Sequence, residues 1–191
     1  MRLFTAVELD PAVRSAAARA AAELRRAIER ANPLFRARWI PEDNFHVTLV
    51  FLGEVPDARV PAVLAALEPP PTVPAFVLTL GRFGAFPPTG MARILWLGVD
   101  EGSAALAALH AEVAARLQPV GFEPERRPYH AHLTLARVAD DARGDRAIRR
   151  LLQECTVEAG ASPAGHVTLV RSRLTPKGAV YEPLLRVPLR P

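Results

Sequence analysis

The sequence predicts an α+β fold in which one domain contains two related lobes flanked by helices. Three observations support this fold class. Half of the 191 residues are apolar, which is enough for a well-packed core. The order strand, helix, strand, helix, strand can be followed twice along the chain. The pattern His-x-Thr-Leu stands at 46–49 and 132–135, where it opens the second strand of each half.

The first half is predicted from turn signals and apolar periodicity. Asp10 followed by Pro11 predicts a helix start, because aspartate caps the first turn and proline fits the first helical position. The triple proline at 69–71 ends a later helix, because proline lacks the amide proton that a helix interior needs. The predicted elements are a strand at 3–9, a helix to about Ala31, a strand at 46–52, a helix at 57–67, a strand at 76–83 and a loop at 84–90.

The second half repeats this order and adds one hairpin. Its predicted elements are a strand at 94–99, a helix at 103–118, a strand at 132–138, a helix at 145–154, a strand at 166–174, a turn at 176–178 and a strand at 180–187. The two motifs lie 86 residues apart (132 − 46). We therefore expect a single domain, 1–191, made of pseudo-symmetric lobes at about 1–86 and 91–191.

The repeated motif predicts where its side chains point. Successive residues of a strand face opposite sides, so His46 and Thr48 share one face, and His132 and Thr134 share another. The leucines and the intervening apolar residues then face the core. We expect the two His-Thr faces to meet across a central groove. Imidazoles that open into separate cavities would contradict this arrangement.

Two further histidines are predicted to lie outside the site. A third copy of the pattern begins at His166, but a shift of 86 residues places it near Leu80, where the first half has no such motif. We therefore interpret His166 as an exposed residue at the start of a strand. His110 flanks the apolar stripe of a predicted helix, which favours a structural role.

Two imidazoles and two hydroxyls fit metal-free cleavage of a phosphodiester. Histidine has an unperturbed pKa of ~6.5, so near neutral pH one ring can accept a proton while another donates one. In-line displacement at phosphorus needs both steps, and threonine hydroxyls can hold the non-bridging oxygens. His130 and His132 form a His-x-His pair, but no acidic residue is spaced to complete a zinc site. We expect no metal and no other cofactor.

Charge and composition restrict the partners. The formal charge is +4 and the pI is about 10.1, carried almost wholly by arginine, since Lys177 is the only lysine. This balance favours anionic partners, although the arginine content alone is also what a GC-rich coding sequence produces. No apolar stretch reaches the ~20 residues of a membrane span, and no signal peptide is recognisable. We expect a cytoplasmic protein without membrane contact, and the single Cys155 excludes an intrachain disulfide.

At these residues the chain resembles the 2H phosphoesterases, and within them the RNA 2′,3′-cyclic phosphodiesterases, also called 2′-5′ RNA ligase-like proteins. The resemblance covers nearly the whole length. The segments that carry it are Arg2-Leu3-Phe4, Arg38-Trp39-Ile40-Pro41, His46 to Gly53, Gly121 to Pro128, His132 to Arg137, and Ser172 to Gly178.

The resemblance implies antiparallel sheets that line a groove, and hydrolysis of RNA 2′,3′-cyclic phosphate ends to 2′-phosphomonoesters. It implies that His46 is the proton donor and His132 the proton acceptor, roles that the sequence alone does not assign. Thr48 and Thr134 would bind phosphate oxygens. Arg137 would be a further phosphate contact, although an ideal strand turns it away from Thr134 unless the strand bends.

The remaining candidates for substrate binding are His130 and the aromatic residues Phe4, Phe51 and Tyr129, and core packing is the favoured interpretation for each of the three aromatic residues. The expected partner is RNA with 2′,3′-cyclic phosphate termini, bound by a monomer. Two alternatives stay open at this point. One is 2′-5′ RNA ligation, the reverse reaction with the same groups. The other is a non-catalytic module that binds RNA ends.

Overall fold

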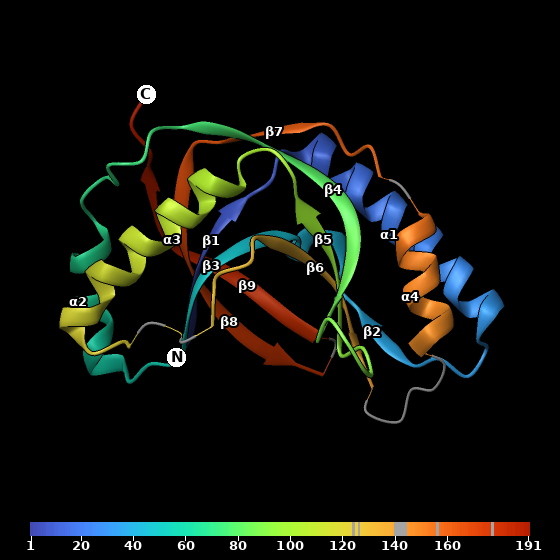
Figure 1. Ribbon diagram of the computed structural model, residues 1–191. Coiled ribbons are helices and arrows are strands. Elements are labelled where there is room, and N and C mark those ends of the chain that lie inside the picture. Colours follow the sequence, from blue (N-terminus) through green and yellow to red (C-terminus); the bar gives the residue numbers. More distant parts are fainter. Residues whose placement is uncertain (124, 126, 140–144, 156, 177) are drawn as a thin grey trace.

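The computed structural model describes residues 1–123, 125, 127–139, 145–155, 157–176 and 178–191. A curled sheet of nine strands carries α-helices on its outside (Figure 1). The strands are β1 (Arg2–Glu8), β2 (Ala37–Trp39), β3 (His46–Glu54), β4 (Phe76–Phe86), β5 (Ile94–Val99), β6 (His132–Val138), β7 (Ala161–Ala164), β8 (His166–Thr175) and β9 (Gly178–Pro188). The α-helices are α1 (Pro11–Ala31), α2 (Val60–Leu67), α3 (Ser103–Leu117) and α4 (Asp145–Glu154).

The two halves of the sequence interleave in the sheet. The strand order is β7-β4-β5-β6-β3-β1-β8-β9, with β2 beside β6, and the paired strands are antiparallel. The counterparts of β1, β3 and β4 in the second half are β5, β6 and β8. The central order β4-β5-β6-β3-β1-β8 stays the same when it is reversed and each strand is replaced by its counterpart. The third strand of each half therefore joins the first strand of the other half.

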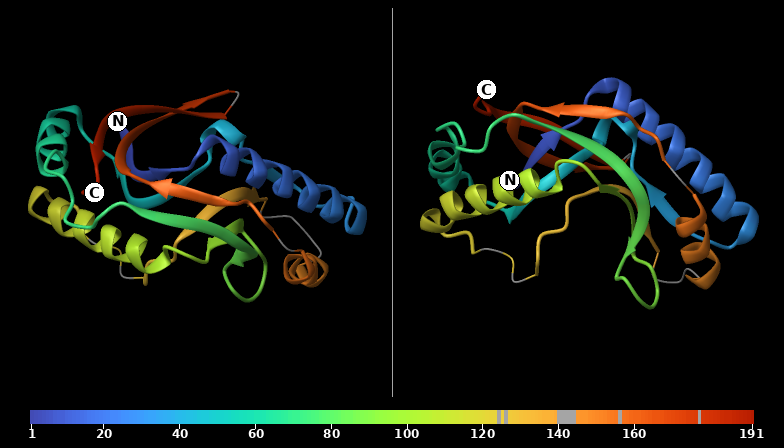
Figure 2. Two further views of the ribbon diagram at one scale, coloured as in Figure 1. Left: turned by 90° about the horizontal axis from the view of Figure 1, so that it is seen from above. Right: turned by 45° about the horizontal axis from the view of Figure 1, so that its top comes forward.

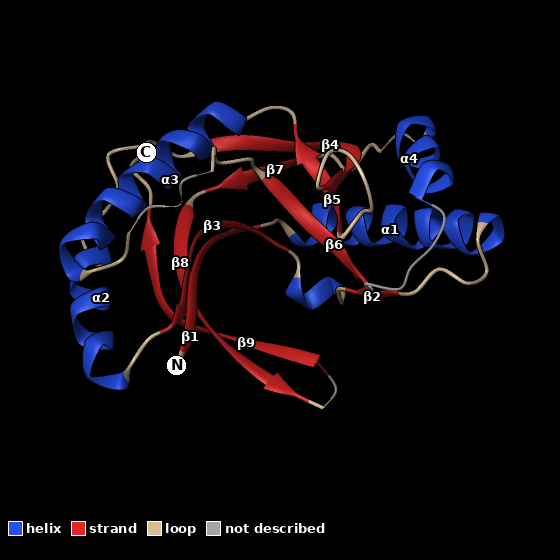
Figure 3. Cartoon of the chain, turned by 60° about the horizontal axis from the view of Figure 1, so that its bottom comes forward, coloured by secondary structure: helices blue, strands red, loops and turns tan. Residues whose placement is uncertain are grey.

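The helices follow the same exchange. α1 packs against α4, and α2 packs against α3. Figure 3 shows these two pairs at opposite ends of the curled sheet, and the two views of Figure 2 show α1 beside α4. Each pair thus combines one helix from each half of the chain. The predicted lobe boundaries at about 1–86 and 91–191 divide the sequence and stay a prediction.

The alternation predicted for the two motif strands is confirmed. Val47, Leu49, Leu133 and Leu135 are buried, whereas the His and Thr residues between them are half-buried. Because a slip of one residue would exchange these two faces, burial of the apolar face fixes the direction in which the polar side chains point.

The first helix begins as the sequence predicts. The side chain of Asp10 accepts a hydrogen bond from the backbone N–H of Ala12 at 2.8 Å, and Pro11 is the first helical residue. The face turned to the sheet is a stripe at helical spacing, made of Val13, Ala17, Ala21, Leu24 and Ile28.

The loop predicted at 84–90 is wrong over its first three residues. β4 continues to Phe86, and Gly84 pairs with Trp96 of β5. A Cβ at position 84 would lie 2.2 Å from the indole ring of Trp96. The glycine therefore marks the close approach of an aromatic ring within a strand, not a turn.

Two short strands escape the sequence prediction. β2 has three residues, too few for a periodic pattern. β7 is the edge strand Ala-Ser-Pro-Ala, and Pro163 is tolerated there because an edge strand leaves one row of amide positions unpaired. The turn predicted at 176–178 connects β8 and β9, but Lys177 lies outside the described residues. Among the helices that the structure describes, none is long and apolar enough to span a membrane.

Candidate active site

The two motifs meet where β3 and β6 pair at the centre of the sheet. The recorded pairing joins Val47 to Leu133 in antiparallel register. Continuing that register by one residue each way places His46 opposite Thr134 and His132 opposite Thr48. The Cβ atoms of directly opposed residues on one face of a sheet lie about 4.5–5.5 Å apart. The pairing therefore sets the two His-x-Thr motifs side by side at the centre of the sheet.

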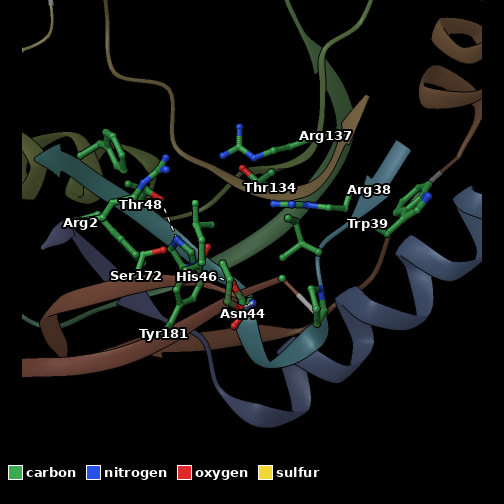
Figure 4. A pocket seen from close by; sticks show the side chains of 17 residues that line it. Arg2, Arg38, Trp39, Asn44, His46, Thr48, Thr134, Arg137, Ser172 and Tyr181 are labelled. Carbon is green, nitrogen blue, oxygen red and sulfur yellow. Dashed lines mark hydrogen bonds between the residues drawn. The ribbon is translucent and has the colours of Figure 1, made fainter. Parts of the chain in front are cut away.

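A backbone carbonyl group orients the ring of His46 through Nδ1. Nδ1 of His46 lies 2.8 Å from the carbonyl oxygen of Asn44. Because a carbonyl oxygen only accepts, Nδ1 carries the hydrogen and Nε2 of the neutral ring is an acceptor. Nε2 lies 3.1 Å from Oγ1 of Thr48, which donates its hydroxyl hydrogen to it (Figure 4).

The ring of His132 is held in the same way. Its Nδ1 lies 2.7 Å from the carbonyl oxygen of His130, again two residues earlier in the chain. The same reasoning leaves Nε2 of His132 as the acceptor nitrogen of the neutral ring. Both motifs therefore present an imidazole in the tautomer that can take up a proton at Nε2.

Burial keeps both rings neutral in the free protein. It lowers the pKa of His46 to about 4, the carbonyl of Asn44 opposes this change, and positive charge on His132 lowers the pKa further. Burial also lowers the pKa of His132, the carbonyl of His130 opposes this change, and positive charge on His130 and Arg137 lowers the pKa further. A bound anion would reverse part of these shifts, because opposite charge favours the protonated ring.

Aromatic side chains fix the orientation of both rings. Phe4 stacks on His46 with ring centroids 4.7 Å apart, and Tyr181 meets His46 edge-on at 5.3 Å. Phe86 meets His132 edge-on at 5.1 Å. Phe4 is only 4% exposed and packs against His46, and it also lines the hollow beside that ring, so substrate contact by Phe4 stays a prediction.

Tyr129 connects the second motif to the first. Its hydroxyl donates to the carbonyl oxygen of Thr48 at 3.0 Å, and its ring stacks on His110 at 4.3 Å. One face of the ring is therefore taken by the protein. Tyr129 thus anchors the backbone of Thr48, and His110, which supports its ring, lines the hollow that also contains His132.

Two hollows adjoin at the motifs. His46 and Thr134 line one, with a volume of about 200 Å³, and His132 lines the other with His130. Thr48 and Phe51 line both hollows. The two imidazoles therefore line two hollows of the free protein rather than the one groove that the sequence predicts. Because the hollows share Thr48 and Phe51, a single phosphate has to lie at this boundary to reach both rings.

A β-bulge turns Arg137 toward the site. Leu95 pairs with Ala136, but the next residue of β5, Trp96, pairs with Thr134, so Leu135 is an extra residue in β6. Leu135 and Ala136 are both buried, and Arg137 returns to the face of Thr134, where it lines the hollow beside His46. This is the bend that a phosphate contact by Arg137 requires.

Comparison with known proteins places the chain in a family. The family profile described as the 2′-5′ RNA ligase superfamily matches residues 13–176. The chain belongs to this superfamily. A relative from Aeropyrum pernix, named RNA 2′,3′-cyclic phosphodiesterase, is 36% identical over 152 residues, which are 78% of this chain and 84% of the relative. An Archaeoglobus fulgidus protein of the same name is 29% identical over 185 residues, 96% of this chain and 98% of the relative.

Solved structures of the superfamily share the fold. A crystal structure of a Thermus thermophilus protein aligns with a TM-score of 0.75 at 29% identity, covering 100% of this chain and 98% of the other. Escherichia coli LigT complexed with phosphate aligns with a TM-score of 0.69 at 25% identity, with the same coverage. The resemblance to the 2H phosphoesterases is therefore confirmed, and the protein is an enzyme of that family.

Sequence reasoning missed several residues of the site in this superfamily member. The hollow beside His46 is also lined by Arg2, Arg38, Asn44, Ser172 and Tyr181 (Figure 4). Arg38 lies directly opposite Arg137 in the pairing of β2 with β6. The segment at 38–41 that carries the resemblance was the available signal for Arg38. Tyr181 has no comparable signal, because it reaches the site only through the β8–β9 hairpin.

The remaining histidine lies away from the motifs. His166 is exposed at the start of β8, as predicted, and it lies outside the residues that line either hollow. Within the described part of the chain, no group of three or more His, Cys, Asp or Glu side chains is placed to hold a metal ion.

Proposed function

We propose that the protein hydrolyses 2′,3′-cyclic phosphate ends of RNA to 2′-phosphomonoesters by two-histidine acid-base catalysis without a metal. The pairing of Val47 with Leu133 carries this proposal, because it sets the two His-x-Thr motifs side by side. The name shared by the relatives, RNA 2′,3′-cyclic phosphodiesterase, supports the choice of substrate.

The proposed reaction is an in-line displacement at phosphorus. Nε2 of His132 takes a proton from water, and the water oxygen forms a bond to phosphorus. The bond from phosphorus to the 3′ oxygen breaks, and protonated His46 gives its Nε2 proton to that leaving oxygen. Thr48, Thr134 and Arg137 hold the non-bridging oxygens, whose negative charge grows during attack.

Nε2 of His46 has to become protonated when the substrate binds. The pKa of His46 is about 4 in the free protein, so its ring is neutral near pH 7. A cyclic phosphate carries negative charge, which raises the pKa of a neighbouring imidazole. Once Nε2 of His46 is protonated it no longer accepts from Thr48, and that hydroxyl is free to donate to a phosphate oxygen.

Turnover of a defined RNA end tests the proposal. The substrate is an oligonucleotide ending in a 2′,3′-cyclic phosphate, incubated with EDTA. His46→Ala and His132→Ala are each expected to lower kcat by about 10²–10⁴, the usual contribution of one general acid or base. His166→Ala is the matched control, because it removes the histidine of the third His-x-Thr-Leu copy and leaves turnover unchanged.

The same assay separates the alternatives. Retained activity in His46→Ala or His132→Ala, with folding verified by circular dichroism, contradicts the two-histidine mechanism. Loss of activity in EDTA contradicts the absence of a metal. No turnover by the wild-type protein favours a module that binds RNA ends. Ligation to a 2′-5′ bond would use the same groups in reverse, and its substrates are an RNA with a cyclic phosphate and an RNA with a 5′-hydroxyl.

A further inference from the structure

The hollow beside His46 carries several unpaired positive charges. Arg2, Arg38 and Arg137 line it, and among the described residues none of the three forms an ion pair with a carboxylate. No described residue that lines the hollow is acidic. Some arginines elsewhere in the described chain pair with carboxylates, as in Arg25 with Glu29, Arg116 with Glu112, Arg150 with Glu154, Arg171 and Arg173 with Glu182, and Arg186 with Glu8.

Two of these arginines stand directly opposite each other. Arg38 of β2 pairs with Arg137 of β6 in the backbone register. Like charges at directly opposed positions of a sheet destabilise the pair. Phosphates bound at these guanidinium groups would offset this repulsion, because arginine binds phosphate with two parallel hydrogen bonds. Figure 4 shows both side chains extending into the hollow from the same side.

The third arginine approaches from β1. The guanidinium group of Arg2 lies over the ring of Phe51, 5.0 Å from its centroid. The charges of all three arginines influence the pKa of Tyr181. Burial raises the pKa of its hydroxyl, while the positive charges of Arg137, Arg2 and Arg38 oppose that change. The three guanidinium groups therefore line one hollow together with Tyr181, whose ring packs against His46.

One cyclic phosphate does not account for this charge. It carries a single negative charge, and Thr48, Thr134 and Arg137 already supply donors for its oxygens. The guanidinium groups of Arg38 and Arg2 are then not needed to bind the cyclic phosphate. We propose that Arg38 and Arg2 form a second phosphate subsite, which binds the phosphate on the 5′ side of the terminal nucleoside. The inference rests on the proposed function, and it assigns the enzyme to substrates with two phosphates.

Two sources share this chemistry. The second phosphate is either the 5′-adjacent diester of an RNA strand or the 5′-phosphate of a single nucleotide. Three substrates distinguish them, namely adenosine 2′,3′-cyclic phosphate, its 5′-phosphorylated form, and the dinucleotide ApA with a 2′,3′-cyclic phosphate end. The first lacks a second phosphate, the second carries it as a monoester, and the third carries it as a diester.

The measured quantity is the gain in kcat/KM over adenosine 2′,3′-cyclic phosphate. We expect a gain of roughly 10- to 100-fold for at least one of the two substrates with a second phosphate, the range for hydrogen bonds to a charged group. Arg38→Gln and Arg2→Gln should each reduce that ratio toward one. Arg25→Gln is the control of equal charge change, and it should keep the ratio, because Arg25 pairs with Glu29 on the exposed face of α1.

A binding measurement tests the subsite without turnover. Calorimetric titration compares adenosine 2′-monophosphate with adenosine 2′,5′-bisphosphate. The second ligand should bind roughly 10- to 100-fold more tightly to the wild-type protein, and Arg38→Gln should remove most of this difference. Equal Kd values for the two ligands overturn the subsite, and so does a gain that survives in both arginine variants.

The two sets of results separate this inference from the proposed function. Equal kcat/KM for all three substrates contradicts the subsite and leaves the phosphodiesterase activity standing. Tighter binding of the bisphosphate without turnover of any substrate contradicts the activity and supports the subsite. A gain for the dinucleotide alone identifies the diester as the recognised group, provided that Arg38→Gln removes it.

Discussion

At the residue scale, the rings of His46 and His132 are each held by a backbone carbonyl group. In each motif the carbonyl two residues earlier accepts the Nδ1 hydrogen, at 2.8 Å and 2.7 Å. This fixes the tautomer and presents Nε2 to the hollow. The sequence predicts the face of each imidazole from strand alternation, but the carbonyl contact depends on the turn that enters the strand, and no residue type encodes it.

Desolvation of the half-buried His46 ring makes stability depend on pH. Its pKa is about 4 in the folded protein and ~6.5 in an unfolded chain, so above pH 6.5 the ring is neutral in both states and contributes nothing. As the pH falls from 6.5 to 4, the unfolded state binds a proton that the folded state does not. The free energy of unfolding should therefore fall by up to about 3 kcal/mol over this range.

Denaturant unfolding between pH 7 and 4 measures this effect. His46→Gln should lose stability less steeply with falling pH than the wild-type protein, whereas His166→Gln should follow the wild type, because His166 is exposed. Equal slopes for the wild type and His46→Gln contradict a desolvated, neutral ring at position 46.

Arg137 and Tyr181 show what residue patterns leave open. Arg137 faces the hollow only because Leu135 is an extra residue in β6, and strict alternation predicts the opposite face. Tyr181 reaches His46 from a strand 135 positions later (181 − 46). Both placements depend on pairing between distant segments, which a single sequence read by periodicity does not contain.

At the scale of elements, the pairing of β4 with β5 supports the second motif. Trp96 packs against Gly84 on one side and contacts the rings of His130 and His132, with centroids 4.8 Å and 6.3 Å away. The sequence predicts both strands but ends β4 too early, because glycine is also the commonest signal of a loop. The strands β2 and β7 are missed since neither shows apolar alternation.

Gly84→Ala tests this support. The new Cβ would lie 2.2 Å from the indole ring, so Trp96 has to move, and its contacts with the histidines change. We expect a loss of about 1–3 kcal/mol in the free energy of unfolding, typical of overpacking, together with lower turnover. Gly165→Ala is the control, because no heavy atom lies within 4 Å of its Cβ. Equal stability of the two variants contradicts the close approach.

At the scale of the whole molecule, the repeated order of elements is visible in the sequence, but the exchange is not. β4 joins β5 and β8 joins β1, so strands of both halves lie on each side of the central pairing between β3 and β6. Helix pairing follows the same exchange, with α1 against α4 and α2 against α3 (Figure 1). Sequence repetition indicates two equivalent units, but it does not predict which strand of one unit pairs with a strand of the other.

This interleaving brings one imidazole from each half to the junction of two hollows at Thr48. The central claim is that both rings act on a single phosphorus atom. A crystal structure with adenosine 2′-monophosphate measures this directly. We predict one phosphate across the junction, with its oxygens in hydrogen-bond distance of Nε2 of both His46 and His132. A phosphate bound beside only one imidazole, with the other facing a separate hollow, would contradict the account.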